Sequence, residues 1–193
     1  MRSPRSLLLA APLLITAYGI LRLAGRADGH YGPGLDWQLA HLAGLAGMLL
    51  FVPAILMLGG LLPASPRRSI TVGVTLVGLA CFAVQFGADI VVGLMAADRA
   101  EMAALSARFG DIPGVTVAFY AVGPQLFFVG ICVLAALLAA AKRVPWWSPA
   151  LMLIGVVLPL ATLDLLPLTG LLMLVALQPA VAASAVARHH RTA

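Results

Sequence analysis

Charged residues are scarce in this sequence. Asp, Glu, Lys and Arg make up 10% of its 193 residues, whereas a soluble globular domain contains about 25%. Hydrophobic residues make up 62%, against about 45–50% in soluble domains, and the mean hydropathy is +1.05. This composition excludes a soluble enzyme, a disordered chain, a nucleic-acid-binding domain and a disulfide-rich secreted domain. It predicts an all-α integral membrane protein.

Cysteines are few, and the common catalytic motifs are absent. Cys81 and Cys132 lie in apolar runs, at a spacing that matches no zinc, thioredoxin or haem-attachment site. The sequence contains no G-x-S-x-G, Walker or H-E-x-x-H motif. Its single glutamate, Glu101, is too few for a carboxylate dimetal centre, which needs several ligands on facing helices. We therefore expect neither a metal nor a cofactor.

Long apolar runs dominate the chain. A helix needs about 20 apolar residues to cross about 30 Å of hydrocarbon. We predict six such helices, over residues 6–23, 37–62, 70–97, 113–141, 146–163 and 165–187. The last two share one apolar run that is too long for a single crossing. Asp164 and Pro167 divide this run, and because proline breaks a helix, we predict a tight hairpin at 163–167.

The charges at the ends of these runs predict the topology, because cytoplasmic loops carry an excess of Lys and Arg. With alternate loops on opposite sides, one side receives eight basic residues: Arg2, Arg5, Arg67, Arg68, Lys142, Arg143, Arg188 and Arg191. The other side receives four basic residues and six of the seven acids: Arg22, Arg26, Arg99, Arg108, Asp28, Asp36, Asp98, Glu101, Asp111 and Asp164. A polytopic bundle with both termini in the cytoplasm is therefore predicted.

The composition also bears on the source of the chain. Eleven of the twelve basic residues are Arg, and Ala, Gly, Leu and Pro are abundant. This pattern is typical of a GC-rich bacterial genome, so the predicted location is the bacterial cytoplasmic membrane. The basic residues occur in ones and twos rather than on one solvated face, which argues against a nucleic-acid partner.

The N-terminal segment has a second interpretation. Arg2 and Arg5 precede an apolar stretch and the sequence Gly25-Arg26-Ala27, an order that is also found in cleaved signal peptides. Cleavage would leave five helices and an external N-terminus. The apolar stretch, residues 7–21, is at the upper length limit for a signal peptide, so we favour an uncleaved first helix.

Two of the predicted external loops contain recognisable local signals. Asp36 precedes Trp37 and is predicted to cap the second helix. Residues 98–109 have apolar side chains at helical spacing and are followed by Gly110. They predict an amphipathic extension of the third helix at the outer interface. This segment is either a lid or, as we favour, a plain connector.

Only one acid lies clearly inside a predicted span. An ionisable residue there costs about 2.5–3.5 kcal/mol on insertion scales, so it usually faces the bundle interior and marks function. Asp89 lies about eight residues, or roughly 10 Å, from the outer end of the third helix. It belongs to a stripe of small and polar residues that is typical of a helix–helix seam: Gly78, Cys81, Gln85, Asp89 and Gly93.

Polar residues in other predicted helices lie at similar depth. We predict an outward-facing pocket lined by Asp89, Gln85, His41 and Gln125, with Arg22, Tyr120 and Asp164 near its mouth. Each residue also has a structural interpretation. Asp89 and the glutamines would then join helices by hydrogen bonds, His41 would be solvated near the interface, and Arg22 would extend to the headgroups.

The leading functional hypothesis is a non-enzymatic membrane protein that holds a small or lipidic ligand around Asp89. One alternative is a small permease or the substrate-binding subunit of a transporter. Another is an intramembrane enzyme that acts on a lipid or isoprenoid, with Asp89 as acid or base. The third alternative is a structural or assembly role. The sequence identifies no protein partner.

Overall fold

The computed structural model describes residues 4–27, 29 and 31–192, and the side chains of residues 6, 8–27, 29 and 31–184. This part of the chain is helical throughout and contains no strand, which confirms the predicted all-α class. In chain order the helices are α1 (Pro4–Arg26), α2 (Leu35–Gly60), α3 (Pro66–Met95), α4 (Arg99–Gly110), the π-helix η1 (Thr116–Val122), α5 (Gly123–Ala140), α6 (Trp147–Ala161), the short 3-10 helix η2 (Leu163–Leu165) and α7 (Leu166–Thr192).

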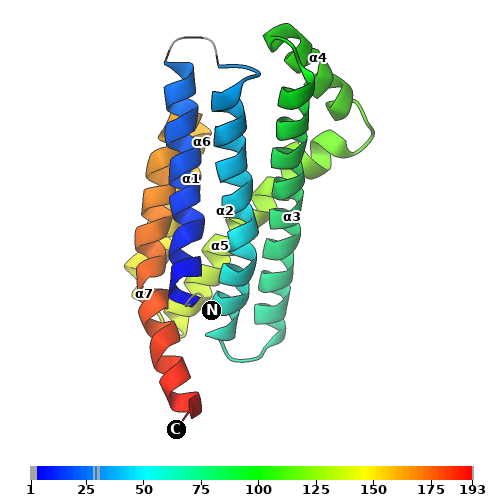
Figure 1. Ribbon diagram of the computed structural model, residues 1–193. Helices are drawn as coiled ribbons and strands as arrows, with labels where there is room; N and C mark the ends of the chain where they lie inside the picture. The colour runs from blue at the N-terminus through cyan, green and yellow to red at the C-terminus, as the bar shows by residue number, and fades with distance from the viewer. Residues whose placement is uncertain (1–3, 28, 30, 193) are drawn as a thin grey trace.

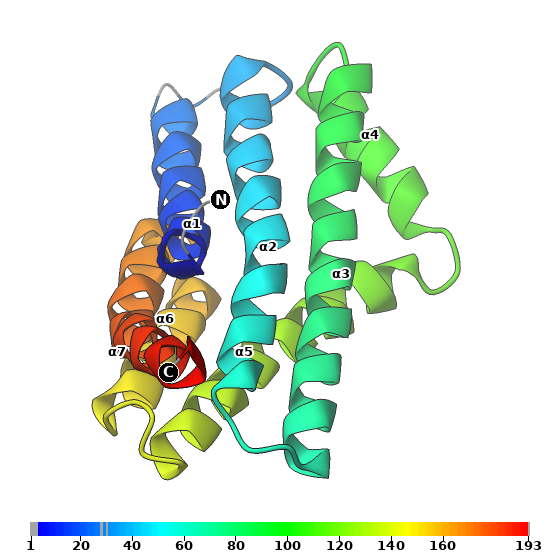
Figure 2. The ribbon, with the colours of Figure 1, turned by 60° about the horizontal axis from the view of Figure 1, so that its bottom comes forward.

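Six of the helices form a closed ring in chain order. Each of α1, α2, α3, α5, α6 and α7 packs against the next, and α7 packs against α1. Figure 1 shows α1, α2 and α3 side by side, with α5 crossing behind them toward α6 and α7. Helix α4 lies outside the ring, beside α3 (Figure 2). We call the end of the molecule with α4 the outer end, and the end with the α2–α3 turn the inner end.

Five helical segments are long and apolar enough to cross a membrane: Leu8–Arg26, Leu35–Gly60, Pro66–Met95, Thr116–Ala140 and Leu163–Ser184. Helix α6 has 15 residues, which corresponds to about 22 Å and is shorter than the hydrocarbon layer of about 30 Å. The count of six crossings and the cytoplasmic termini stay predictions. Of the residues that carry the topology argument, Arg2, Asp28 and the side chains of Arg5, Arg188 and Arg191 lie outside the described part of the chain.

The helix break predicted at 163–167 is present. Helix α6 ends at Ala161, Thr162 is extended, and η2 leads into α7 at Leu166. In Figure 1 this hairpin lies nearer the middle of the molecule than the outer ends of α1 and α2. The recessed position places Asp164 beside α1, where Arg22 reaches it.

The segment 98–110 is a separate helix and not the predicted extension of α3. Helix α3 ends at Met95, and two reciprocal hydrogen bonds start α4. The Asp98 carboxylate accepts from the Glu101 backbone N–H at 2.8 Å, and the Glu101 carboxylate accepts from the Ala97 N–H at 2.8 Å. This capping box supplies the partners that a helix start needs, so the chain turns at 96–98 and begins a new helix.

Two further local predictions were wrong. Asp36 is not the cap of α2, because the helix begins at Leu35 and Asp36 lies in its first turn. A carboxylate there still interacts favourably with the positive end of the helix dipole. The predicted helix 113–141 is also not uniform. It begins as the π-helix η1 and becomes α-helical at Gly123-Pro124, where proline lacks the N–H that would continue the hydrogen-bond ladder.

Small residues bring α3 and α5 close together, as the predicted stripe on α3 requires. A Cβ atom at Gly78 would overlap the backbone of Phe127, and one at Gly123 would overlap Cys81. Gly130 packs in the same way against Thr75. The stripe contacts two helices. Its inner part packs against α5, whereas Gly93, at its outer end, packs against Trp37 of α2.

Aromatic rings fill the centre of the ring of helices. Phe82 contacts three other phenylalanines, Phe86, Phe127 and Phe128, at centroid distances of 5.2 to 6.2 Å. The enclosed apolar cavity among these rings measures only about 20 Å³. The core is therefore closely packed, and the larger hollows of the outer half lie nearer the surface.

Candidate functional site

Asp89 lies on α3, six residues before the helix ends at Met95, which corresponds to a depth of about 9 Å. Its side chain is 21% exposed. The Tyr120 hydroxyl donates a hydrogen bond to Asp89 Oδ1 at 3.3 Å, and His41 Nε2 lies 3.9 Å from Oδ2. Three of the residues predicted to form the pocket, from α3, η1 and α2, therefore meet at one carboxylate.

The hydrogen bond of His41 Nδ1 identifies which ring nitrogen carries a proton. Nδ1 lies 2.8 Å from the Trp37 backbone carbonyl oxygen, which only accepts hydrogen bonds. Nδ1 therefore carries a proton, and Nε2 is the nitrogen that faces Asp89. In the neutral ring Nε2 is an acceptor, and at 3.9 Å it is too far from Asp89 Oδ2 for a hydrogen bond, so the two groups attract each other only when the imidazole is protonated.

His41 is buried in an aromatic enclosure, rather than solvated at the interface. The Trp37 ring stacks on it at 4.0 Å with an interplanar angle of 25°. Tyr18 and Phe86 contact its other sides at 5.6 and 5.8 Å. Phe86 approaches closely because Gly44 has no side chain in its way. The enclosure fixes the imidazole orientation and leaves the ring almost without solvent contact.

Trp37 and Gln38 fix α2 against α3 beside the carboxylate. Trp37 Nε1 donates to the Asp89 backbone carbonyl at 3.0 Å, and Gln38 Nε2 donates to the Ile90 carbonyl at 3.2 Å. The sequence indicated Trp37 as the start of a helix and gave no signal for Gln38. The spacing of Trp37 and His41, one helical turn apart, was the available signal, because such residues share a face.

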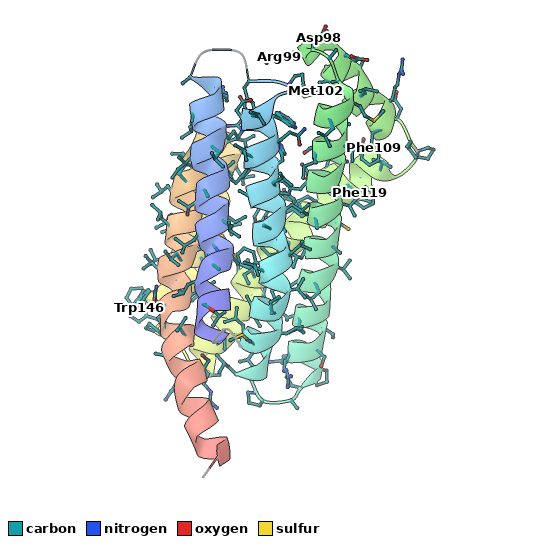
Figure 3. The ribbon with its side chains drawn as sticks, viewed as in Figure 1. Asp98, Arg99, Met102, Phe109, Phe119 and Trp146 are labelled. Atoms are coloured by element: carbon teal, nitrogen blue, oxygen red, sulfur yellow. The ribbon has the colours of Figure 1, made fainter. Side chains whose placement is uncertain are left out.

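The π-helix η1 supplies the opposite wall. Tyr120 lies on it, and the Thr116 hydroxyl donates to the Gly110 carbonyl at 2.9 Å, which ties η1 to the end of α4. The ring of Phe109 contacts Tyr120 edge-on at 6.3 Å, and both Phe109 and Phe119 extend from this region in Figure 3. Short π-helices are frequent at functional sites, and this one places a hydroxyl on Asp89.

A cavity of about 430 Å³ opens beside Asp89, between α3, α4 and η1. Its lining includes two carboxylates and three hydroxyl groups but no Lys, Arg or His: Asp89, Ser106, Ala107, Gly110, Asp111, Thr116 and Tyr120. Its size is within the range of about 300–1,000 Å³ that is usual for ligand pockets. The lining favours a cationic ligand or one rich in hydrogen-bond donors.

The structure does not bring all the predicted residues together. Gln85 is half-buried, and Gln125 is exposed. Neither glutamine makes a hydrogen bond to Asp89 within the described residues, although Gln85 lies one turn before it on the same face of α3. Arg22 and Asp164 belong to a different cluster, where Asp164 Oδ1 accepts from Arg22 at 3.1 Å and from Arg26 at 2.5 Å.

This arginine cluster borders a second hollow of about 320 Å³ at the outer end. Arg22, Arg26, Gly29, Tyr31 and Arg99 line it. The guanidinium of Arg22 lies 6.0 Å from the centre of the Tyr31 ring, within cation–π distance. Burial raises the pKa of the Tyr31 hydroxyl above its ordinary value, so the group stays protonated and remains a hydrogen-bond donor.

Fold and site together define an all-helical bundle with five membrane-length apolar helices and a carboxylate-lined cavity in its outer half. Comparison with known protein families, curated proteins and solved structures finds no match for this chain. No group of three or more His, Cys, Asp or Glu side chains is arranged to hold a metal ion within residues 4–192 as described.

Proposed function

We propose that this chain is a multi-pass protein of the bacterial cytoplasmic membrane that holds a small or lipidic ligand in the cavity beside Asp89, without catalysing a reaction on it. One observation carries the proposal. The Asp89 carboxylate reaches the cavity from a helix of membrane-spanning length, and Tyr120 and His41 hold it in place.

The chemistry of the lining indicates the class of ligand. Asp89 and Asp111 supply negative charge, and the hydroxyl groups of Ser106, Thr116 and Tyr120 supply further acceptors. A partly buried carboxylate is stabilised by an opposite charge or by hydrogen-bond donors. We therefore favour a ligand that carries an amine or another cationic group on its polar part.

The charges at the two ends support the proposed orientation. Arg67 and Arg68 begin α3, and Lys142 and Arg143 follow α5, all at the inner end. An excess of basic residues is characteristic of cytoplasmic loops. The inner end, where α1 begins and α7 ends, is therefore assigned to the cytoplasm, and the Asp89 cavity opens in the half that faces away from it.

Thermal unfolding of the detergent-purified protein with small amines tests the ligand class. Ethanolamine, choline and spermidine serve as probes, and sodium chloride at equal ionic strength serves as the control. Saturating amine raises the unfolding temperature of the wild type by about 5 °C, because a ligand that binds only the folded state stabilises it. Asp89→Asn abolishes the rise, because the amine loses its counter-charge.

Gln125→Ala is the reference variant, since Gln125 is polar, exposed and outside the cavity. It responds to amines as the wild type does. The same amine response in the wild type and in a folded Asp89→Asn variant, or none in either, contradicts a cationic ligand at this carboxylate.

A further inference from the structure

The arginine-lined hollow at the outer end is separate from the Asp89 cavity. No residue lines both. The hollow lies where α1 ends and α4 begins, and it is built from residues of α1, the α1–α2 loop and α4. Figure 3 shows Arg99 at this outer end. A ligand here is therefore recognised independently of one that occupies the Asp89 cavity.

The described residues that line this hollow include three arginines and no carboxylate. Arg22 and Arg26 share a single carboxylate, Asp164. Arg99 is exposed and makes no ion pair within the described residues. Asp36 lies near Gly25, on the Tyr31 side of the hollow. Among the described residues that line the hollow, Arg99 is thus the guanidinium without an ion-pair partner, and its charge is available to a ligand.

The Tyr31 hydroxyl is a second and independent observation. It is buried from solvent and has no hydrogen-bond partner among the described residues. A buried donor without a partner costs free energy, so such groups usually have one. Tyr31 lines the hollow, but its hydroxyl oxygen is covered in this structure, so the ring must turn for the hydroxyl to donate to an acceptor atom bound there.

We propose that this hollow binds a phosphate group, carried either by a lipid headgroup or by a small soluble phosphate ester. Guanidinium groups match the geometry of phosphate oxygens and form charge-assisted hydrogen bonds with them. Arg99 and Arg26 supply charge from two sides of the hollow, and Tyr31 supplies a neutral donor. Arg22 also lines the hollow, where its contacts with Asp164 and with the Tyr31 ring hold it in place.

Native mass spectrometry of the delipidated protein tests the proposal with three probes. Phosphatidylglycerol represents the lipid source, glycerol 3-phosphate the soluble source, and diacylglycerol with the same acyl chains lacks the phosphate. Wild type is compared with Arg99→Gln, Tyr31→Phe and Arg108→Gln. Arg108 is exposed at the other end of α4 and lines neither hollow, so it controls for net charge.

Arg99→Gln weakens binding of a phosphate-bearing probe about tenfold, the scale of one charge-assisted hydrogen bond. Tyr31→Phe weakens it as well, Arg108→Gln does not, and diacylglycerol binds all four proteins alike. A response confined to phosphatidylglycerol identifies a lipid, and one confined to glycerol 3-phosphate identifies a soluble ester. Equal binding of both phosphate probes by all four proteins overturns the proposal. Equal weakening by Arg99→Gln and Arg108→Gln overturns it too, because it shows only general surface charge.

Discussion

At the scale of single residues, the contact between Asp89 and His41 is the most specific feature of the molecule. His41 Nδ1–H donates its hydrogen bond to the Trp37 carbonyl oxygen, so only Nε2 faces the Asp89 carboxylate. A ligand amine that binds Asp89 would approach the carboxylate beside Nε2 of His41. The aromatic enclosure around His41 keeps the ring in place.

Tyr120→Phe tests how the carboxylate is held. The substitution removes the hydroxyl that donates to Asp89 Oδ1 and leaves the ring that packs on Phe109. We expect the free energy of unfolding to fall by about 0.5–1.5 kcal/mol, the net value of one hydrogen bond. We also expect weaker stabilisation by amines, and thermal unfolding measures both. Unchanged stability together with an unchanged amine response would show that the hydroxyl does not hold Asp89.

The sequence identified Asp89 but only some of its partners. Hydropathy predicts the depth of a residue, and helical periodicity predicts which residues share a face. Neither predicts how one helix is rotated against another. Gln125 and His41 were equally plausible partners by depth, and only the packing of α2 and α5 on α3 separates them. Gln38 bonds to a backbone carbonyl, a partner that no sequence pattern indicates.

At the scale of elements, the contact between α3 and α5 depends on glycine. Gly78 is buried where the backbone of Phe127 leaves no room for a Cβ atom, whereas Gly73, five residues earlier on α3, has no atom within 4 Å of that position. The same helix thus contains a glycine that packing requires and one that it does not.

Gly78→Ala and Gly73→Ala form a matched pair. We expect Gly78→Ala to lower the free energy of unfolding by about 1–3 kcal/mol, because the methyl group forces the two backbones apart. We expect Gly73→Ala to be neutral or to stabilise by up to about 1 kcal/mol, because alanine favours a helix. Thermal unfolding in detergent measures both. Equal effects of the two substitutions would contradict the close approach of α3 and α5.

Most elements were predictable and their irregular junctions were not. Apolar runs indicated α1, α2, α3, α6 and α7 to within about five residues of their ends, and the predicted helix 113–141 covers η1 and α5 together. The capping box of Asp98 and Glu101 is readable in the sequence, but the apolar spacing of residues 98–109 predicted a continuation of α3. The π-helix before Gly123 arises from packing against α3 and from the missing N–H of Pro124, and sequence periodicity does not reveal it.

At the scale of the whole molecule, the closed ring of helices accounts for the position of both polar sites. Its centre is filled by phenylalanine side chains, so charged groups lie toward the two ends of the bundle, and both sites lie in its outer half. The Asp89 cavity lies between α3, α4 and η1, and the arginine-lined hollow lies between the end of α1, the α1–α2 loop and the start of α4. Composition predicted a membrane bundle, but the order of the ring and the recessed hairpin at Asp164 depend on tertiary contacts.

Native mass spectrometry of the detergent-purified wild type beside Asp89→Asn tests the central claim most directly. The account predicts a small-molecule or lipid adduct on the wild type that is missing from an Asp89→Asn variant with an unfolding temperature close to that of the wild type. The mass of the adduct would begin to identify the ligand. A bare chain in both samples, with equal stability, would contradict the account, because it would show that Asp89 holds no ligand.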